Sequence, residues 1–383
     1  MRPPFNSYPH LLIYATSRRT AYFESIVRGI IEYSNLRARF QLFYHLTEAA
    51  LDGALDQAPG CDAIIGHLAG EDLEIARRSG KPLVLVEQDP VEGVPVVRAD
   101  NVAVGRMAYE HLAAKGFTRY AYCGIPGQLY SQEREQGFFD AARQAGHGIH
   151  VAPSDLRAVV EESAADWIES LPRPIGVLIH NALHARDIIF ALGKRGVLVP
   201  EEVAILGVDE DTTLCETSIP PLTSVDQGCL EIGRRAAAIL HGMLGDPAIA
   251  PPPLTLVPPV GVIERQSTDI LAVHDPHVAR ALRYIAVHFS ERINAADVCK
   301  QVPVARRTLE AQFADAMGRG IYQEILRRRI EHAKKLLARS DMLLSEIALE
   351  CGMEWGGELT RIFKKLTGET PSQYRKAHTL KKG

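Results

Sequence analysis

The sequence predicts an α/β region with doubly wound parallel sheets, followed by an all-α region. Up to about residue 270, short β-rich apolar runs alternate with segments of helical period, which is typical of parallel α/β folds. After residue 277 only helical periodicity is found. A length of 383 residues also exceeds that of most single domains, so we expect at least two domains.

The α/β region is expected to start with a strand at 11–16 and a helix at 21–35. Further strands are expected at 41–46, 63–68, 82–87, 120–124, 176–181 and 203–209, and further helices at 104–116 and 133–146. Gly116 and Gly146 stand where glycine commonly ends a helix. Because the alternation occurs in two halves that join near residues 98–116, we expect two similar lobes.

The all-α region is expected to contain six helices, at 278–291, 293–302, 305–318, 321–340, 345–351 and 355–366. The period changes within residues 264–277. We therefore predict a first domain at 8–270, a linker at 271–277 and a second domain at 278–378.

Charge is distributed unevenly along the chain. The net charge is −4, but from His274 onward 20 Lys and Arg stand against 13 Asp and Glu. A basic end on an acidic body indicates a polyanionic partner for that end. Six cysteines are scattered without a CxxC pair, which favours a reducing cytoplasm over disulfides or a zinc site. The sequence shows neither a cleavable secretion signal nor an apolar run of ~20 residues, so a cytoplasmic protein without a membrane partner is expected.

Two pairs of helices in the second domain repeat one pattern: a short helix, a tight turn and a second helix. The pairs lie at 293–318 and 345–366, on either side of the linking helix at 321–340. Leu309 and Phe313 in the first pair correspond to Leu359 and Phe363 in the second. A spacing of four residues buries one stripe of a helix and leaves the opposite face free for a DNA major groove. We therefore predict two helix-turn-helix units that bind double-stranded DNA.

Three motifs stand out in this domain: IALECGM (347–353), LTRIFKKLTG (359–368) and TPSQYR (370–375). With the span from 278 to 374, they resemble the AraC/XylS family of transcription regulators. The resemblance implies DNA contacts from exposed positions of the two recognition helices. These positions are Arg306, Arg307, Glu310, Glu358, Thr360, Arg361, Lys364 and Lys365. For any one of them, and for Arg327, Arg328 and Arg329 as phosphate contacts, a solvated surface charge is an equal alternative.

Two features of the recognition helices depart from the family pattern. Recognition helices of the family commonly start with a capping Ser, whereas this chain has Ala305 and Trp355. The second helix also has Gly356 and Gly357 where polar side chains that contact bases are usual. The second unit is therefore expected to discriminate less between sequences, or to read DNA by shape.

Polar side chains follow three predicted strands at the ends where parallel α/β folds bind ligands. Asp100, Asn181 and Asp209 come after VVRA, VLIH and AILGV. Carboxylates and amides suit the hydroxyl groups of a sugar, and Tyr22 and Phe23, after the first strand, can stack on a pyranose ring. A strand-end residue such as Asp100 is equally explained as a helix cap.

Longer motifs of the first domain are ADNVAVGRMAYEHLAAKGFTRYAYCG (99–124), EREQGF (133–138), LVPEEVAILGVDED (198–211) and PPLTSVDQGCLEIGRRAA (220–237). They resemble the periplasmic-binding-protein-like sensor domain of LacI/GalR regulators. The resemblance implies a two-lobed sensor with its ligand between the lobes, and it adds Gln132, Arg134 and Gln227 to the ligand-binding residues. That family carries its DNA-binding headpiece before the sensor, and we expect residues 1–9 to be too short for one.

A LacI-like sensor joined to an AraC-like DNA-binding domain resembles the layout of bacterial regulators of xylose catabolism. It implies an activator that responds to D-xylose or another sugar, acts as a homodimer and contacts RNA polymerase. One alternative is a regulator of another sugar or of a purine-like ligand, for which Phe23, Tyr130 and Gln132 would decide the ligand. Two further alternatives are a solute-binding protein and a sugar-modifying enzyme. We find no catalytic constellation or cofactor motif, and HNALH (180–184) lacks the Glu of HExxH. We therefore predict no enzyme, no cofactor and no metal.

Overall fold

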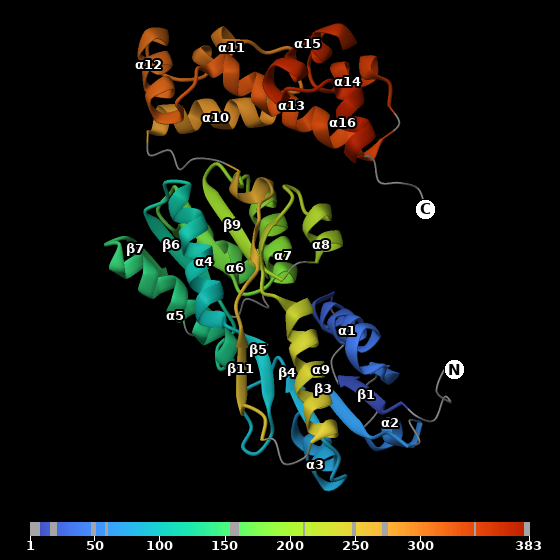
Figure 1. Cartoon of the computed structure of the whole chain (residues 1–383). Helices are drawn as coiled ribbons and strands as arrows, with labels where there is room; N and C mark the ends of the chain where they lie inside the picture. The colour runs from blue at the N-terminus through green and yellow to red at the C-terminus, as the bar shows by residue number, and fades with distance from the viewer. Residues whose placement is uncertain are drawn as a thin grey trace. The chain divides into compact units, whose positions relative to one another are not determined.

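The structure is a computed structural model that describes residues 8–15, 21–46, 51–57, 60–153, 161–209, 211–246, 250–269, 275–340 and 342–378. Contacts within the chain divide it into two units, Met1–Ile270 and Leu271–Gly383, each with its own fold (Figure 1). In the described part of the chain, no helix combines the length and apolarity of a membrane span.

The first unit contains two six-stranded sheets of the same connectivity. The first sheet has the order β11-β5-β4-β3-β1-β2, with all described pairs parallel. Its strands are β1 His10–Ala15, β2 Gln41–Leu46, β3 Ala63–His67, β4 Leu83–Val86, β5 Val96–Ala99 and β11 Leu254–Val257. β4 and β5 are buried throughout, as expected of central strands covered on both faces.

The second sheet has the order β12-β10-β9-β8-β6-β7, in which β12 pairs antiparallel with β10 and the other pairs are parallel. Its strands are β6 Arg119–Cys123, β7 Gly148–Val151, β8 Ile175–Ile179, β9 Val203–Val208, β10 Thr223–Asp226 and β12 Gly261–Ile263. We call the first sheet with its helices lobe 1 and the second sheet with its helices lobe 2. The predicted doubly wound α/β class is confirmed, and the seven expected strands lie within two residues of their predicted ends.

The helices of each lobe cover its sheet (Figure 1). Lobe 1 has α1 Ala21–Tyr33, a π-helical turn Ser34–Ala38, α2 Leu51–Gln57, α3 Gly70–Arg78 and α9 Cys229–Gly245. Lobe 2 has α4 Asn101–Ala114, α5 Leu129–Gln144, α6 Glu161–Ser170, α7 Ala182–Lys194, α8 Thr212–Thr217 and the 3₁₀ turn Gln266–Thr268. The chain passes between the lobes after β5, after β10 and after β11.

In each lobe, one pair of helices packs closely at a crossing point formed by glycines. A Cβ atom on Gly29 of α1 or on Gly233 of α9 would overlap a backbone carbonyl oxygen of the other helix. The same holds for Gly105 of α4 and Gly137 of α5 in lobe 2. Helices this close need glycine because any side chain would collide with the opposite backbone. The two lobes therefore share a packing device as well as a strand order.

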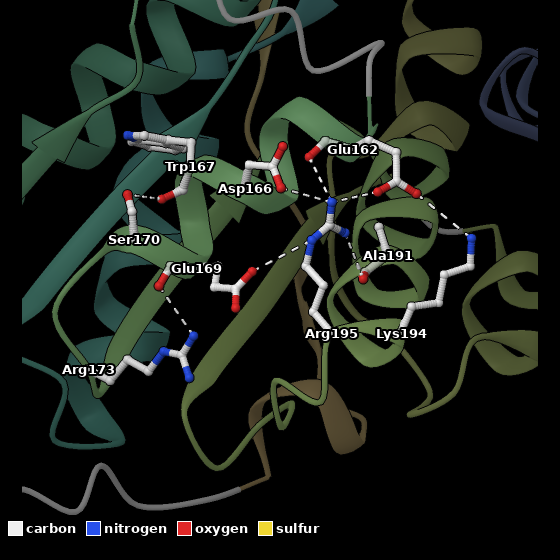
Figure 2. A network of polar contacts seen from close by, with 9 residues as sticks. All are labelled: Glu162, Asp166, Trp167, Glu169, Ser170, Arg173, Ala191, Lys194 and Arg195. Carbon is white, nitrogen blue, oxygen red and sulfur yellow. Dashed lines mark hydrogen bonds and ion pairs between the residues drawn. The ribbon is translucent and has the colours of Figure 1, made fainter.

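On the surface of lobe 2, Arg195 lies beside acidic side chains of α6 (Figure 2). Its guanidinium is 2.5 Å from Glu162 Oε2 and 2.9 Å from Asp166 Oδ1, and it donates to the Ala191 carbonyl at 2.9 Å. The two carboxylates are 59% and 69% exposed, so solvent screens these ion pairs. The network orients α6 against α7 more than it stabilises them.

The second unit is entirely helical in its described residues, as predicted. Its helices are α10 Pro276–His288, α11 Ala295–Lys300, α12 Arg306–Met317, α13 Ile321–Arg339, α14 Leu344–Glu350, α15 Gly356–Thr367 and α16 Pro371–His378. Leu309, Phe313, Leu359 and Phe363 are all fully buried, which confirms the predicted stripes. The helix α16 was not expected. It begins with a proline, and its Tyr374 ring packs against Phe363 at 5.5 Å.

Candidate functional site

A cavity of about 570 Å³ lies in the first unit at the carboxyl ends of strands from both lobes. Its wall consists of Tyr22, His67, Leu68, Ala69, Gly70, Leu73, Glu87, Gln88, Asp89, Val91, Gln128, Tyr130, Arg134, Asn181, Asp209 and Gln227. The volume is in the range of sites for small organic ligands. Parallel α/β sheets bind ligands at this edge.

Two carboxylates face the cavity from equivalent positions. Glu87 follows β4 and Asp209 follows β9, and these strands hold the same place in the two sheets. Both residues have left-handed backbones, with φ of 49° and 86°. Among the described residues only Arg39 shares this conformation without being glycine. Such strain is costly and concentrates at functional sites, where it fixes the direction of a side chain.

The environment raises the pKa of both carboxyl groups. Burial raises the pKa of Glu87 to about 7, although the Ala99 N–H and Arg134 oppose the shift. Glu87 Oε1 accepts a hydrogen bond from the Ala99 N–H at 2.7 Å. Burial also raises the pKa of Asp209, again opposed by Arg134. A ligand whose hydroxyl groups donate hydrogen bonds to these carboxylates would stabilise their charged forms.

Arg134 on α5 is the central cation of the site and is only 3% exposed. Its Nε donates to Asn101 Oδ1 at 2.8 Å and its guanidinium also donates to the His180 carbonyl. A further N–H donates to Gln227 Oε1 at 2.5 Å, and Gln227 Nε2 donates to Asp209 Oδ1 at 2.5 Å. Arg134 thus connects α4, α5, β8 and the segment that leads from β10 to α9.

An ion pair formed by the residue before Arg134 links the two lobes. Arg98 of β5, in lobe 1, forms a bidentate ion pair with Glu133 of α5, in lobe 2, with distances of 2.6 and 2.8 Å. The side chains are 7% and 21% exposed, so water screens the pair little. Of these two neighbouring residues, Glu133 therefore links the two lobes, whereas Arg134 joins elements of lobe 2 and the segment that leads from β10 to α9.

Two histidines lie beside the wall residues Arg134 and Tyr130 without lining the cavity themselves. His180 is fully buried, and its Nε2 lies 2.7 Å from His184 Nδ1. Burial lowers the pKa of His180 well below its usual value, with His184 and Arg134 acting in the same direction. The Tyr130 ring lies against Arg134, with 5.0 Å between its centroid and Cζ. No group of three or more metal-ligating side chains occurs among the described residues.

Five of the eight predicted ligand-binding residues line the cavity together: Tyr22, Arg134, Asn181, Asp209 and Gln227. Asn181 Oδ1 also caps α7 by accepting the His184 N–H at 2.8 Å, so its amide nitrogen is the group that can face a ligand.

The other three predicted residues lie elsewhere. Phe23 is 1% exposed in the core of lobe 1, so it offers no face to a ligand. The Asp100 carboxylate accepts the Ala103 N–H at 2.9 Å as the N-cap of α4. Gln132 lines a separate cavity of about 290 Å³ with Glu135. Asp100 therefore follows the alternative of a helix cap, whereas Phe23 is a core aromatic residue.

Sequence reasoning missed Glu87 and the residues of lobe 1 around it. The signal was present, because Glu87 ends the apolar run PLVLVE just as Asp209 ends VAILGVD. Leu68, Leu73 and Val91 give lobe 1 an apolar contribution to the wall that no motif indicated.

In the second unit, α11–α12 and α14–α15 form the two helix-turn-helix pairs. Five of the predicted DNA-contacting side chains are exposed: Arg306, Arg307, Arg361, Lys364 and Lys365. The other three, Glu310, Glu358 and Thr360, are half-buried.

Three of the eight have partners within the helices. Arg306 Nε donates to Glu310 Oε1 at 2.8 Å, so these two residues of α12 form an ion pair in the free protein. Thr360 Oγ1 donates to the Gly356 carbonyl at 2.9 Å.

The arginine run of α13 has a different place from the one expected. Arg329 is 6% exposed and donates to the carbonyls of Phe289, Glu291 and Ile293. The side chains of Arg327 and Arg328 pair with the buried Glu324. Arg329 therefore supports the fold between α10 and α11, and a phosphate contact by this side chain is excluded.

Comparisons with known proteins agree with this architecture. A model of the periplasmic binding protein-like domain matches residues 109–268, and a model of the helix-turn-helix domain matches residues 298–377. The xylose operon regulatory protein of Escherichia coli (strain K12) is 31% identical over 317 residues, which cover 80% of this chain and 80% of that protein. The chain belongs to the family of xylose operon regulatory proteins.

Other members and structures support the same family. The xylose operon regulatory protein of Haemophilus influenzae is 31% identical over 294 residues, covering 73% of this chain and 74% of that protein. The solved structure of the xylose-binding transcription activator xylR has a TM-score of 0.79 and 27% identity over 98% of this chain and 100% of its own. Both resemblances predicted from the motifs are confirmed. The first unit is a periplasmic-binding-protein-like sensor, and the second is the DNA-binding domain of a transcription regulator.

Proposed function

We propose that this regulator activates genes of pentose catabolism and that its effector is D-xylose, bound in the cavity of the sensor. The observation that carries the proposal is the convergence of Glu87, Asp209 and Arg134 on one cavity between two lobes. The membership of the xylose operon regulatory family supports the identity of the sugar.

The chemistry of the wall suits a pyranose. The carboxylates of Glu87 and Asp209 accept hydrogen bonds from hydroxyl groups, and the amide nitrogen of Asn181 donates hydrogen bonds to hydroxyl oxygens. Leu73 and Tyr22 offer apolar surface to the C–H face of the ring. Each polar side chain that a ligand leaves unpaired costs about 1 to 3 kcal/mol, which provides selectivity between sugars.

Sugar binding would act on the contact between lobes. Asp209 is held by Gln227, and Gln227 by Arg134, so a hydroxyl group that competes for Asp209 alters the same chain of hydrogen bonds. A ligand held by residues of both lobes binds the closed arrangement better and shifts the population toward it. The closed sensor then changes how the DNA-binding domain engages its operator.

The remaining parts of the proposal follow from this role. The regulator acts as a homodimer on repeated half-sites and contacts RNA polymerase, and it works in the cytoplasm, where its DNA is found. The sensor binds its sugar without converting it, so recovered sugar should be chemically unchanged.

A second candidate function is regulation by a different sugar. Gln88, Asp89 and Gln128 add polar groups to a cavity of about 570 Å³, which has room for a ligand larger than a pentose. A hexose or a disaccharide would use these groups.

The test is a thermal-shift screen of the purified full chain with pentoses, hexoses, disaccharides and purines. We expect D-xylose to raise the Tm of the wild type and of the surface control Asp166→Ala, and to have no effect on Asp209→Asn. A gel shift with the promoter of the regulated genes should change when D-xylose is added. A shift with another sugar alone would replace the effector, and no shift with any compound would overturn the sensor function.

A further inference from the structure

The second recognition helix, α15, begins with an exposed indole. Trp355 is the N-cap residue, has no side-chain capping hydrogen bond and is 63% exposed. A Cβ atom on Gly357 would overlap three atoms of the Trp355 six-membered ring. The ring therefore occupies the space that a side chain at position 357 would fill.

This start of α15 is unfavourable for folding. Glycine in the first turn costs a helix about 1 kcal/mol relative to alanine, and α15 has two. An N-cap without a side-chain acceptor loses about 1 kcal/mol more, and the indole keeps most of its apolar surface in water. Local choices that oppose stability are commonly retained for function.

The indole lies on the face of α15 that is free to meet DNA. Leu359, Ile362 and Phe363 are buried on the core side of the helix. Gly357, Arg361 and Lys364 recur at intervals of four and three residues, which places them on one face, opposite the core. Arg361 and Lys364 are exposed cations suited to DNA. The first residues of a recognition helix are those that reach base edges in the major groove.

The first helix-turn-helix pair, α11–α12, is built differently at this point. There α12 begins after Ala305 with Arg306 and Arg307, both exposed. Arginine recognises guanine through hydrogen bonds, whereas an apolar surface in the major groove recognises the 5-methyl group of thymine. The two helix-turn-helix units therefore present opposite chemistry at corresponding positions.

We propose that Trp355 is a specificity-determining residue that contacts a thymine 5-methyl group in the half-site bound by α15. The glycine at 357 is required because it leaves room for the ring. This inference rests on the DNA-binding role of the second unit, and it concerns which base the helix-turn-helix pair α14–α15 selects.

The first experiment selects duplexes from a random-sequence library with the full-length wild type, Trp355→Ala and Leu349→Ala. Leu349 is a matched control, an apolar side chain on α14 that is 57% exposed. We expect the wild type and Leu349→Ala to select a motif with a fixed thymine, and Trp355→Ala to lose preference at that position alone. Gly357→Ala should behave like Trp355→Ala, because alanine favours the helix yet displaces the ring.

The second experiment replaces that thymine with deoxyuridine, which lacks only the methyl group. Wild-type affinity should fall about fourfold, the effect of one buried methyl group, while the affinity of Trp355→Ala should not change. An unchanged selected motif, or equal sensitivity of both proteins to deoxyuridine, would overturn the proposal.

Fluorescence gives an independent measurement, because Trp167 and Trp355 are the two tryptophans of the chain. In Trp167→Phe, the selected duplex should quench the remaining emission. Binding without any change in emission would overturn the proposal and leave the DNA-binding function standing. Failure of the wild type to select any duplex would overturn both.

Discussion

The two lobes of the sensor have the same construction and different chemistry. Both have six strands in equivalent order and two helices that cross at glycines. In both, the third strand from one edge is followed by an acidic residue with a left-handed backbone conformation. Lobe 1 adds Leu68, Leu73 and Val91 to the cavity, whereas lobe 2 adds Arg134, Asn181 and the hydrogen-bonded Tyr130. A sugar has an apolar face and a polar edge, so two lobes of different character suit it better than two identical ones.

The difference shows that repeated architecture and ligand specificity are set by separate residues. Gly29, Gly233, Gly105 and Gly137 maintain helix packing and lie outside the cavity wall. The residues that distinguish the lobes lie outside the strands, in loops or on the helices α3 and α5, where a change alters the ligand without altering the sheet.

The largest effect is expected when the shared packing is broken. Gly137→Ala in lobe 2 and Gly233→Ala in lobe 1 should each lower the free energy of unfolding by about 3 kcal/mol, because a Cβ atom would overlap a backbone carbonyl. Gly193→Ala in α7 and Gly242→Ala in α9 are controls with open space around the new methyl group. These controls should be neutral or stabilising by up to about 1 kcal/mol in urea unfolding. Equal losses in the controls and the crossing glycines would contradict the packing argument.

Removal of the central cation should affect lobe 2 nearly as much. Arg134→Met leaves Asn101, the His180 carbonyl and Gln227 without their donor, and should cost about 3 kcal/mol. Sugar-induced stabilisation should also disappear. Arg143→Met, on the exposed side of the same helix, should change both quantities little. An Arg134→Met protein that keeps its Tm would show that these hydrogen bonds do not stabilise lobe 2.

The pH dependence of stability tests the raised pKa of both carboxylates. Between about pH 4.5 and 7, folded Glu87 keeps a proton that the unfolded chain has lost, so the free energy of unfolding falls as pH rises through this window. Glu87→Gln lacks this loss and should gain about 2 kcal/mol relative to the wild type between pH 5 and 7.5, allowing for solvent at the open cavity. Asp209→Asn should show a change of the same sign. Melting curves of the ligand-free proteins at several pH values measure it, and parallel curves for wild type and Glu87→Gln would refute it.

The smallest effect is expected on the surface of lobe 2. Arg195→Ala removes the ion pairs to Glu162 and Asp166 in Figure 2 and should lower the Tm less than any of the changes above, because solvent screens these pairs. The loss should shrink further in 0.5 M salt. A loss as large as that of Gly137→Ala would mean that α6 and α7 depend on this network rather than on their apolar core.

The sequence predicted those parts of the fold that depend on local pattern. Strand and helix alternation, the buried stripes at Leu309 and Leu359, and the second motif-rich domain were all readable from neighbouring residues. The strands β7, β10, β11 and β12, of three or four residues each, were not predicted. Their pairing is set by distant partners, as for β11, which joins the sheet of β5 although some 150 residues separate them.

The candidate site was predicted in part for a similar reason. Arg134, Asn181 and Asp209 were found from strand ends and motifs, and the structure brings them to one cavity. Phe23 and its neighbour Tyr22 could not be separated, because both follow the first strand and only packing decides which one faces the core. Glu87 was missed because a single acidic residue after a strand has many explanations until its backbone conformation is known.

The linking helix α13 lies between the two helix-turn-helix pairs in the sequence. Its 19 residues span about 28 Å, close to the ~34 Å repeat of the DNA major groove. Arg329 fastens it to the carbonyls at the end of α10, and Ile330 and Leu337 are buried along its length. This helix contacts α11 and α12 of one helix-turn-helix pair and α14 and α15 of the other, so it holds both pairs in one unit. An operator with five base pairs inserted between the two contacts would turn one of them to the far side of the duplex, and the DNA, not the helix, would have to deform.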